Sequence, residues 1–376
     1  MQYVVKIVFL TDLHIGNPKV PAKIVHENLI QYLYPTLDDT VDFLILGGDF
    51  FDGMVTLDSE AGLVANMIIR DLQLLAAKHK FLIRGIRGTF THDRHQAKQL
   101  MVASKQMPLR LENKQLIIIH DNVIVEKFDK HGISMLFIPD ELPFDNLFET
   151  AHELITAASL DKVDIVVHHG YCQHLLPSNL PHTPPNVYSA KEYAQLAHGP
   201  VLNGHVHKPG VYRQIVSGGS FERLAHAEEE DKGFFIVEYN PDNHHTSYNF
   251  IKNSGAIKFL TIDLPPTVTI PVALTMLQDV AELLVGEILA YVRIKTDDPI
   301  LRHAAKEMMK KYQNIVFSYD SISRSKQQID VVENEDLKCV LQPMTPDNLP
   351  GIISKFLATS GITLTTEVIK TELAEL

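Results

Sequence analysis

The sequence has little cysteine, no long hydrophobic run and a deficit of basic residues. Its 376 residues include only two cysteines, Cys172 and Cys339. Two cysteines are too few for a disulfide framework and suit a reducing cytosol, so we expect a cytoplasmic protein. No apolar run approaches the about 18 residues that a membrane-spanning helix requires. The opening residues, MQYVVKIVFL, have the pattern of a first strand rather than of a signal peptide, so we expect no membrane association.

The charge balance limits how the protein could bind nucleic acid. Lysine and arginine number 34 against 46 aspartates and glutamates, a formal net charge of -12. This charge argues against a protein that coats nucleic acid by bulk electrostatics. An acidic chain can still act on DNA where metal ions and a local basic rim reverse the sign at the site.

The order of apolar segments predicts an α/β fold in the first part of the chain. Short runs rich in Val, Ile and Phe alternate with helical spacing, as at 60–78 and 149–160, and strands then follow closely from about 199 to 263. The alternation indicates βαβ units, and the later strands indicate antiparallel pairing. Two packed sheets flanked by helices would satisfy both patterns, and we expect them within residues 1–264.

A second unit is predicted after the prolines near position 265. Residues 271–318 have the pattern of a small β-α element, 319–345 that of a polar linker, and 346–376 that of two short amphipathic helices. Such helices have little core of their own, so we expect them to bury their apolar face against a partner.

Several strands of the first domain end in residues that bind metals. Because ligands in α/β sheets gather at the carboxyl ends of strands, one site could collect these residues. Asp and His without Cys suit Mn²⁺, Mg²⁺, Fe or Zn²⁺ in a hydrolytic role. Each motif is weak singly, and their shared placement is what indicates a metal site. The candidates are Asp12, His14, Asp49, Asp52, His168, His169, His205 and His207.

Two of these positions leave alternatives open. His168 and His169 compete for one ligand role, and His168 is favoured because it directly ends the apolar run. Asp52 is interpreted as a supporting or structural residue. The acidic run from Glu228 to Asp231 is interpreted as a solvated turn.

The order of motifs resembles the calcineurin-like metallophosphoesterases. They are Asp-X-His, Gly-Asp-X-X-Asp, X-His-Asp, a strand-ending His and Gly-His-X-His, between residues 12 and 207. The resemblance implies an α-β-β-α sandwich with two divalent metal ions, most simply Mn²⁺, with Mg²⁺ as an alternative. It implies one ion on Asp12, His14, Asp49 and His207. It implies a second on Asp49, His168, His205 and a residue of the third motif.

The third motif departs from the family pattern. The family has Gly-Asn-His-Asp or Gly-Asn-His-Glu, whereas this chain has GTFTHD at 88–93, with two inserted residues and no Asn. Thr91 is placed at the Asn position as a weaker metal ligand. By the resemblance His92 meets the leaving oxygen, and Asp93 is expected to orient His92.

Basic residues surround this motif. Either they form an ordinary solvated turn, or they neutralise DNA phosphates beside the metals. The candidate DNA-binding residues are Arg84, Arg87, Arg94 and Lys98, with Lys306 and Lys310 on a helix of the second unit, where Arg302 and Lys311 could extend the rim.

A narrower resemblance links the chain to the SbcD-type DNA repair exonucleases. It is carried by SGGSFERLAHAEEEDKGFFIVE at 217–238. This resemblance implies a capping domain, C-terminal helices that bind an SbcC-type coiled-coil ATPase, and a homodimer. The implied activity is Mn²⁺-dependent exonuclease on duplex ends and endonuclease on single strands. Two alternatives stay open: a phosphatase or cyclic-nucleotide phosphodiesterase of the same superfamily, and a catalytically weak DNA-binding subunit.

Overall fold

The computed structural model describes residues 3–94, 96–97, 110–111, 114–140, 147–176, 187–265, 267–303 and 311–320. The chain divides into two compact units. One comprises Met1–Leu260 with Gly286–Tyr291, and the other Thr261–Val285 with Val292–Leu376. The predicted helices at 346–376, and all of the predicted linker except positions 319 and 320, lie outside the described residues.

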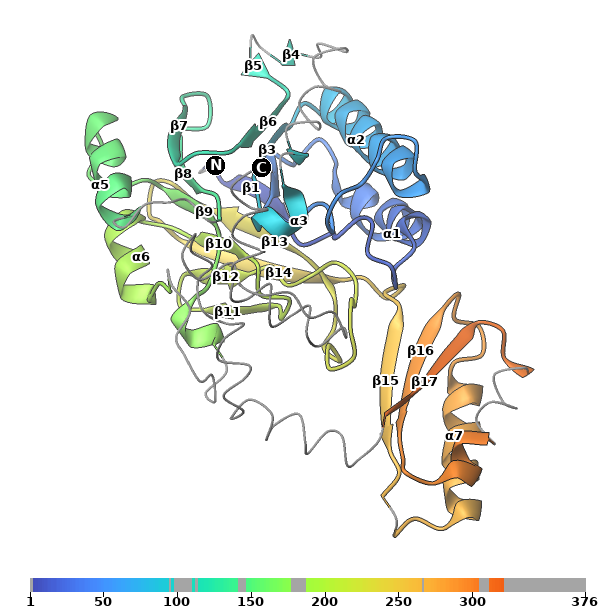
Figure 1. Ribbon diagram of the computed structural model, residues 1–376. Coiled ribbons are helices and arrows are strands. Elements are labelled where there is room, and N and C mark those ends of the chain that lie inside the picture. The colour runs from blue at the N-terminus through green and yellow to red at the C-terminus, as the bar shows by residue number, and fades with distance from the viewer. Residues whose placement is uncertain are drawn as a thin grey trace, which may run out of the picture. The chain divides into compact units, whose positions relative to one another are not determined.

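Two mixed sheets form the centre of the first unit (Figure 1). The first sheet has the order β14 (Thr246–Lys252), β13 (Gly233–Tyr239), β1 (Val5–Leu10), β2 (Phe43–Leu46), β3 (Leu82–Ile86) and β6 (Ile117–His120). The second has the order β11 (Gly210–Tyr212), β12 (Ile215–Ser217), β10 (Val201–Gly204), β9 (Ile165–His169), β8 (Ile133–Ile138) and β7 (Ile124–Phe128). In each sheet four neighbouring strands are parallel, β1-β2-β3-β6 and β12-β10-β9-β8. The prediction of a mixed α/β fold is confirmed.

Strand alternation explains the layers of this unit. Side chains of Ile7 on β1 and Val167 on β9 belong to one core shared by both sheets. Val8, one residue along β1, belongs to a second core with residues of the helices α1 (Ala22–Asn28) and α2 (Glu60–His79). Val166 belongs to a third core with residues of α5 (Leu147–Ala157) and α6 (Ala190–Leu196). The layers are therefore helix, sheet, sheet and helix.

Short elements complete the first unit. Helix α1 continues as a π-helical segment (Leu29–Leu33) and a 3₁₀ turn (Tyr34–Thr36), and α3 (Phe90–Asp93) follows β3. A 3₁₀ turn (Gln173–Leu175) follows β9, and β4 (Arg110–Leu111) pairs with β5 (Lys114–Gln115). Helix α2 starts where the Ser59 hydroxyl accepts the Gly62 N–H at 3.1 Å, which satisfies one of the unpaired amide groups of its first turn.

A small sheet consists of β15 (Lys258–Asp263), β16 (Ala290–Lys295) and β17 (Ile315–Asp320). The second unit contains β17, the parts of β15 and β16 from Thr261 and Val292 onward, and the helix α7 (Ile270–Leu283). Ala273, Leu277 and Ala281 are buried along α7 at a spacing of four residues, which places them on one helix face. Residues 299–303 are also helical. None of the described helices combines the length and apolarity needed to cross a membrane.

Candidate metal centre

Loops at the carboxyl ends of strands from both sheets meet at one cluster of ligand-type side chains. The loops after β1 and β2 supply Asp12, His14 and Asp49, and the loop after β10 supplies His205 and His207. Strand β9 ends in His169, which joins them. The described residues contain three groups that could each hold a metal ion: Asp12, His14 and His207; Asp49, His169 and His205; and His14, Asp49 and His92.

The first group points its ligand atoms at a common centre. His14 Nε2 lies 3.1 Å from His207 Nε2 and 3.8 Å from Asp12 Oδ1, and His207 Nε2 lies 3.7 Å from the same oxygen. Ligands about 2.1 Å from one ion stand roughly 3.0 to 3.4 Å apart, depending on the coordination geometry. Modest contraction would therefore let these three side chains share one ion.

Asp49 lies between His14 of the first group and His169 of the second. Its Oδ2 lies 3.7 Å from His14 Nε2 and 3.4 Å from His169 Nε2. The Thr89 hydroxyl lies 3.3 Å from this oxygen and from His169 Nε2, and 3.2 Å from His205 Nδ1. A carboxylate in this position can bridge two ions about 3.5 to 4 Å apart.

The imidazoles are held with one nitrogen facing the carboxylates. His169 Nδ1 lies 2.7 Å from the Gly47 carbonyl oxygen, and His207 Nδ1 lies 3.1 Å from Glu228 Oε1. A proton on Nδ1 leaves Nε2 with a free lone pair, which is the form that binds a metal. The orientation of these two rings therefore fits a metal ion at the centre of the cluster.

The charges of the cluster also favour a cation. Burial by itself lowers the pKa of His14 and His169, but the nearby carboxylates of Asp12 and Asp49 outweigh it and raise both pKa values to about 10. Burial by itself raises the pKa of Asp12, yet the surrounding imidazoles hold this pKa below its usual range. The buried carboxylates thus require compensating positive charge, which a divalent ion would supply in place of the imidazole protons.

Backbone strain is concentrated at the same residues. Asp12, His14, Asp49 and His205 have φ values of 53°, 49°, 49° and 83°. Each costs of order 1 to 3 kcal/mol for a residue other than glycine, and such strain clusters at functional sites. Glycine at position 88 allows the chain to pass close to Asp49, because a Cβ there would meet the Asp49 backbone nitrogen at 2.1 Å.

His169, and not His168, faces this cluster, which corrects the preference drawn from the sequence. Successive residues of a strand point to opposite faces, so His169 follows the inward set of Ile165 and Val167. His168 follows Val166 toward α6, where its Nδ1 contacts the Tyr193 hydroxyl and lies 3.1 Å from Asn203 Oδ1. The position of a histidine at the end of the apolar run does not show which of His168 and His169 faces the cluster. The alternation of side chains along the strand does show it.

The threonine that contacts Asp49 is Thr89 and not Thr91. This corrects the prediction that Thr91 is the metal ligand of the third motif. Thr91 is exposed on α3, whereas the Thr89 N–H donates to Asp49 Oδ1 at 2.6 Å. Thr89 directly follows Gly88, as the Asn does in the Gly-Asn-His motif. Under the resemblance to that motif, the two additional residues would be Phe90 and Thr91, which lie on the short helix α3.

His92 is oriented by Asp52, which takes the role expected of Asp93. His92 Nδ1 lies 2.8 Å from Asp52 Oδ1, and Asp52 also accepts the Asn17 side-chain N–H at 2.7 Å. The hydrogen bond to Asp52 raises the pKa of His92. Asp93 is buried and accepts the Phe51 and Gly88 backbone N–H groups. Burial and the charge of Asp49 raise the pKa of Asp93 to about 6.

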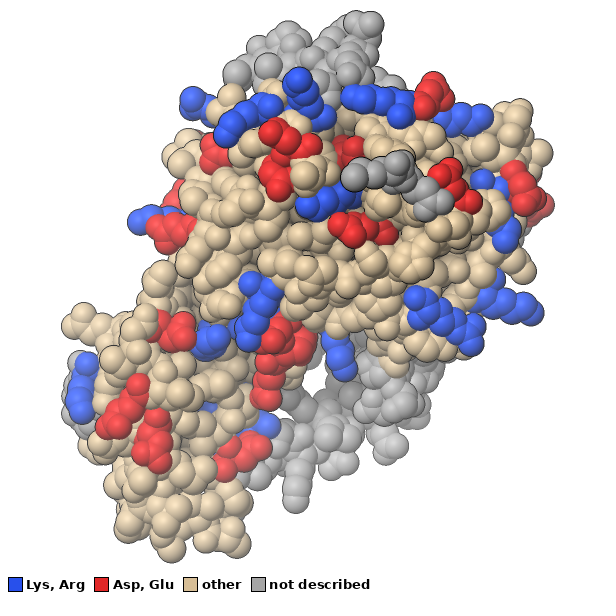
Figure 2. Space-filling model, turned by 180° about the vertical axis from the view of Figure 1, so that it is seen from behind, with Lys and Arg blue, Asp and Glu red and all other residues tan. Residues whose placement is uncertain are grey.

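Most of the predicted basic rim is not at the surface or lies outside the described residues. Arg84 is fully buried and pairs with Glu126 at 2.8 Å, and Arg87 is half-buried and donates to the Asp140 carbonyl at 2.8 Å. The Arg302 guanidinium donates to the Thr296 carbonyl. Arg94 is exposed. Lys98, Lys306 and Lys310 lie outside the described residues. On the face in Figure 2, basic and acidic side chains are interspersed.

The prediction of a solvated turn at 228–231 is wrong for Glu228, which contacts His207 of the cluster. Its side chain is 17% exposed, and Lys232, four residues later, is fully buried against it at 2.8 Å. An acidic run gives no sign from sequence alone that one of its members faces inward. The sequence shows only that Lys232 follows Glu228 at a spacing of four. The burial that makes this lysine need a carboxylate partner is visible only in the structure.

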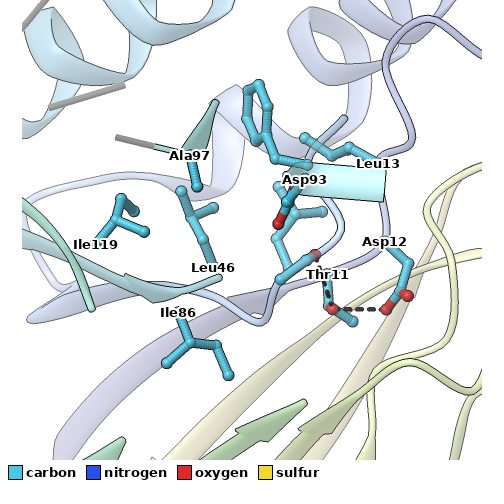
Figure 3. Close-up of a pocket in the computed structure, with 11 residues that line it drawn as sticks. Thr11, Asp12, Leu13, Leu46, Ile86, Asp93, Ala97 and Ile119 are labelled. Carbon is cyan, nitrogen blue, oxygen red and sulfur yellow. Dashed lines mark hydrogen bonds between the residues drawn. The ribbon is translucent and has the colours of Figure 1, made fainter. Parts of the chain in front are cut away.

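The cluster is open to solvent on one side. The side chains of His92 and His207 are 35% and 27% exposed, whereas those of Asp12, His14, Asp49 and His169 are at most 3% exposed. The cavity on the inner side, shown in Figure 3, has a volume of only about 10 Å³. It is lined mainly by apolar side chains such as Leu46, Ile86 and Ile119, with the Asp93 carboxyl among them. Such a space holds about one water molecule.

Comparisons with known proteins add no assignment. No protein-family model and no curated protein matches the sequence. One solved crystal structure is similar over 66% of this chain and all of its own chain, with 10% identity and a TM-score of 0.38. The glutamine-dependent NAD⁺ synthetase of Acinetobacter baumannii is similar over 93% of this chain and 70% of its own, with 13% identity and a TM-score of 0.29. These similarities are too low to support a conclusion about fold or function.

Proposed function

We propose that this protein is a metal-dependent phosphodiesterase of the calcineurin-like type that cleaves DNA. The observation that carries the proposal is the position of Asp49 between two ligand groups, with Oδ2 3.7 Å from His14 Nε2 and 3.4 Å from His169 Nε2. The helix, sheet, sheet, helix layers agree with the sandwich that the sequence motifs imply. The proposed physiological role is that of a nuclease subunit beside an SbcC-type ATPase.

The residues have separable roles in this proposal. Asp12, His14, Asp49 and His207 would hold one ion, and Asp49, His169 and His205 the other, with Thr89 beside them. Bound Mn²⁺ or Mg²⁺ would activate water for attack on phosphorus and stabilise charge on the phosphoryl oxygens. Asp52 holds His92 Nδ1, so His92 Nε2 can donate a proton to the departing sugar oxygen.

A phosphatase or small-substrate phosphodiesterase is the second candidate. The burial of Arg84 and the contact of Arg87 with a backbone carbonyl remove two of the cations expected to bind DNA phosphates. A small substrate needs only the metals and His92, so the engagement of these two arginines inside the protein is the observation that supports this second candidate. The ligand cluster is compatible with either substrate.

One experiment separates these functions. Purified protein with Mn²⁺ is incubated with labelled duplex DNA, labelled single-stranded DNA and bis(4-nitrophenyl) phosphate. The proposal predicts cleavage of DNA, abolished by EDTA and reduced about 10²- to 10⁴-fold by His92→Ala. Cleavage of the small ester with no DNA cleavage would support the second candidate. DNA binding without turnover of any substrate would contradict both and support a DNA-holding subunit.

A further inference from the structure

The acidic segment at 228–231, which follows the GSFER residues at 219–223, folds back onto the proposed metal centre. Glu228 Oε1 lies 3.1 Å from His207 Nδ1. The other carboxylate oxygen, Oε2, lies 2.8 Å from Lys232 Nζ and 3.3 Å from the Leu224 N–H. One carboxylate oxygen therefore contacts the His207 imidazole, and the other is held by Lys232 and the Leu224 backbone.

Lys232 holds both Glu228 and the backbone of His207. Its fully buried Nζ contacts Glu228 Oε2 at 2.8 Å, Glu230 Oε1 at 3.0 Å and the His207 carbonyl oxygen at 2.8 Å. An ammonium group has three donors, and these three contacts use all of them. Burying a charge at this depth is costly unless it is paired and hydrogen-bonded. His207 is therefore fixed at its carbonyl and at Nδ1 by one connected set of residues.

We propose that Glu228, held by Lys232, is a positioning residue that sets the tautomer and orientation of His207 for the ion shared with Asp12 and His14. The assignment rests on the proposed metal centre. A carboxylate that accepts the Nδ1 proton leaves Nε2 free, and His207 Nε2 is the atom that lies 3.1 Å from His14 Nε2. Glu228 has no comparable path to the Asp49, His169 and His205 group among the described contacts. Its loss should affect one ion and not the other.

The test is titration of the full-length protein with MnCl₂ by calorimetry, comparing the wild type with Glu228→Ala, Glu228→Gln and Glu230→Gln. The last variant removes a charge from the same lysine without touching His207, so it is the matched control. We expect Glu228→Ala to weaken one of two Mn²⁺ binding events about 10- to 100-fold. Glu228→Gln, whose amide oxygen can still accept the His207 proton, should lose less, and Glu230→Gln should match the wild type.

Equal weakening by Glu228→Ala and Glu230→Gln, or two unchanged binding events in every variant, would overturn the assignment. If Glu228→Ala does not fold, as judged by thermal unfolding, Glu228→Gln decides the question: a smaller weakening of one Mn²⁺ event that Glu230→Gln does not share supports the assignment, and wild-type binding of both ions contradicts it. A wild type that binds no Mn²⁺ contradicts the metal centre and this assignment together. Failure to cleave DNA with both Mn²⁺ events intact contradicts only the proposed function.

Discussion

Asp52 lies between two imidazoles of the cluster. Its Oδ1 is 2.8 Å from His92 Nδ1 and 3.6 Å from His14 Nδ1, while Oδ2 accepts the Asn17 side-chain N–H. A carboxylate in this place fixes the ring that would donate a proton and also borders a ring that would bind an ion. Asp52 would therefore support both the proton donor, His92, and one of the candidate metal ligands, His14.

The first prediction concerns Asp52. Asp52→Asn keeps the shape but removes the charge that supports a protonated His92. We expect a loss of about 10- to 100-fold in the rate of phosphodiester cleavage at saturating Mn²⁺, because proton transfer of this kind contributes about 10²- to 10⁴-fold. Asn17→Ala, which removes only a support of Asp52, should lose less. An Asp52→Asn enzyme with the wild-type rate would remove Asp52 from the account.

The second prediction concerns Thr89. The threonine side chain is shorter than that of asparagine, so Thr89→Asn should bring a neutral oxygen closer to the Asp49, His169 and His205 group. We therefore expect Thr89→Asn to lower the Mn²⁺ concentration needed for half-maximal activity. Thr91→Asn is the matched control, because Thr91 is exposed on α3. An equal metal requirement for the wild type and Thr89→Asn would contradict this placement.

Elements, rather than single residues, explain what could be predicted from sequence. Short apolar runs are followed, within a few residues, by Asp12, His14, Asp49, His205 and His207. The structure brings these residues together because parallel strands deliver their carboxyl ends to one edge. The burial of Arg84 was not predictable in this way. It depends on Glu126 of the other sheet, 42 residues away in sequence. The residues near Arg84 in the sequence do not show that an ion-pair partner on a distant strand will bury it.

The period of two along β9 gives the third prediction. His169→Ala should abolish binding of one Mn²⁺ ion, because His169 Nε2 faces Asp49. His168→Ala should keep both ions and lose about 1 to 3 kcal/mol of folding free energy, since it leaves buried polar partners unsatisfied. Calorimetric Mn²⁺ titration and urea unfolding of both variants test this. Loss of an ion in His168→Ala alone would reverse the assignment.

The fourth prediction concerns the ion pair between β3 and β7, which joins the two sheets. Burial raises the pKa of Glu126, but His120 and Arg84 outweigh it and hold this pKa below its ordinary value of 4.5. A lowered folded pKa means that the carboxylate contributes stability above about pH 4.5, and that this contribution is lost as pH falls through the folded pKa. Glu126→Gln should therefore destabilise the protein by about 1 to 3 kcal/mol at pH 7.

The difference between the wild type and Glu126→Gln should begin to shrink below about pH 4.5, where the carboxyl of the unfolded chain takes up a proton, and should vanish once the pH has passed the lower pKa of the folded state. Urea unfolding at a series of pH values measures it. A difference that stays constant from pH 7 to pH 3 would show that charge is not what Glu126 contributes. Mn²⁺ binding should match the wild type at pH 7, because Glu126 contacts none of the metal-centre residues in the described structure.

At the scale of the whole molecule, the candidate metal centre draws its residues from both sheets. The first sheet supplies Asp12, His14 and Asp49, and the second supplies His169, His205 and His207. The chain is acidic overall, with a net charge of -12. In the proposed function, attraction for a phosphodiester would therefore come from cations held at this site and from local basic residues. Asp49, shared between the two halves, is the residue on which the account depends most.

The most direct test is electron paramagnetic resonance of the full-length protein loaded with Mn²⁺, comparing the wild type with Asp49→Asn. Two ions bridged by one carboxylate at about 3.5 to 4 Å interact magnetically. The account predicts a spin-coupled spectrum at two Mn²⁺ per chain in the wild type, and its loss in Asp49→Asn. A wild type that binds a single uncoupled ion, or a coupled pair that survives Asp49→Asn, would contradict the shared metal centre.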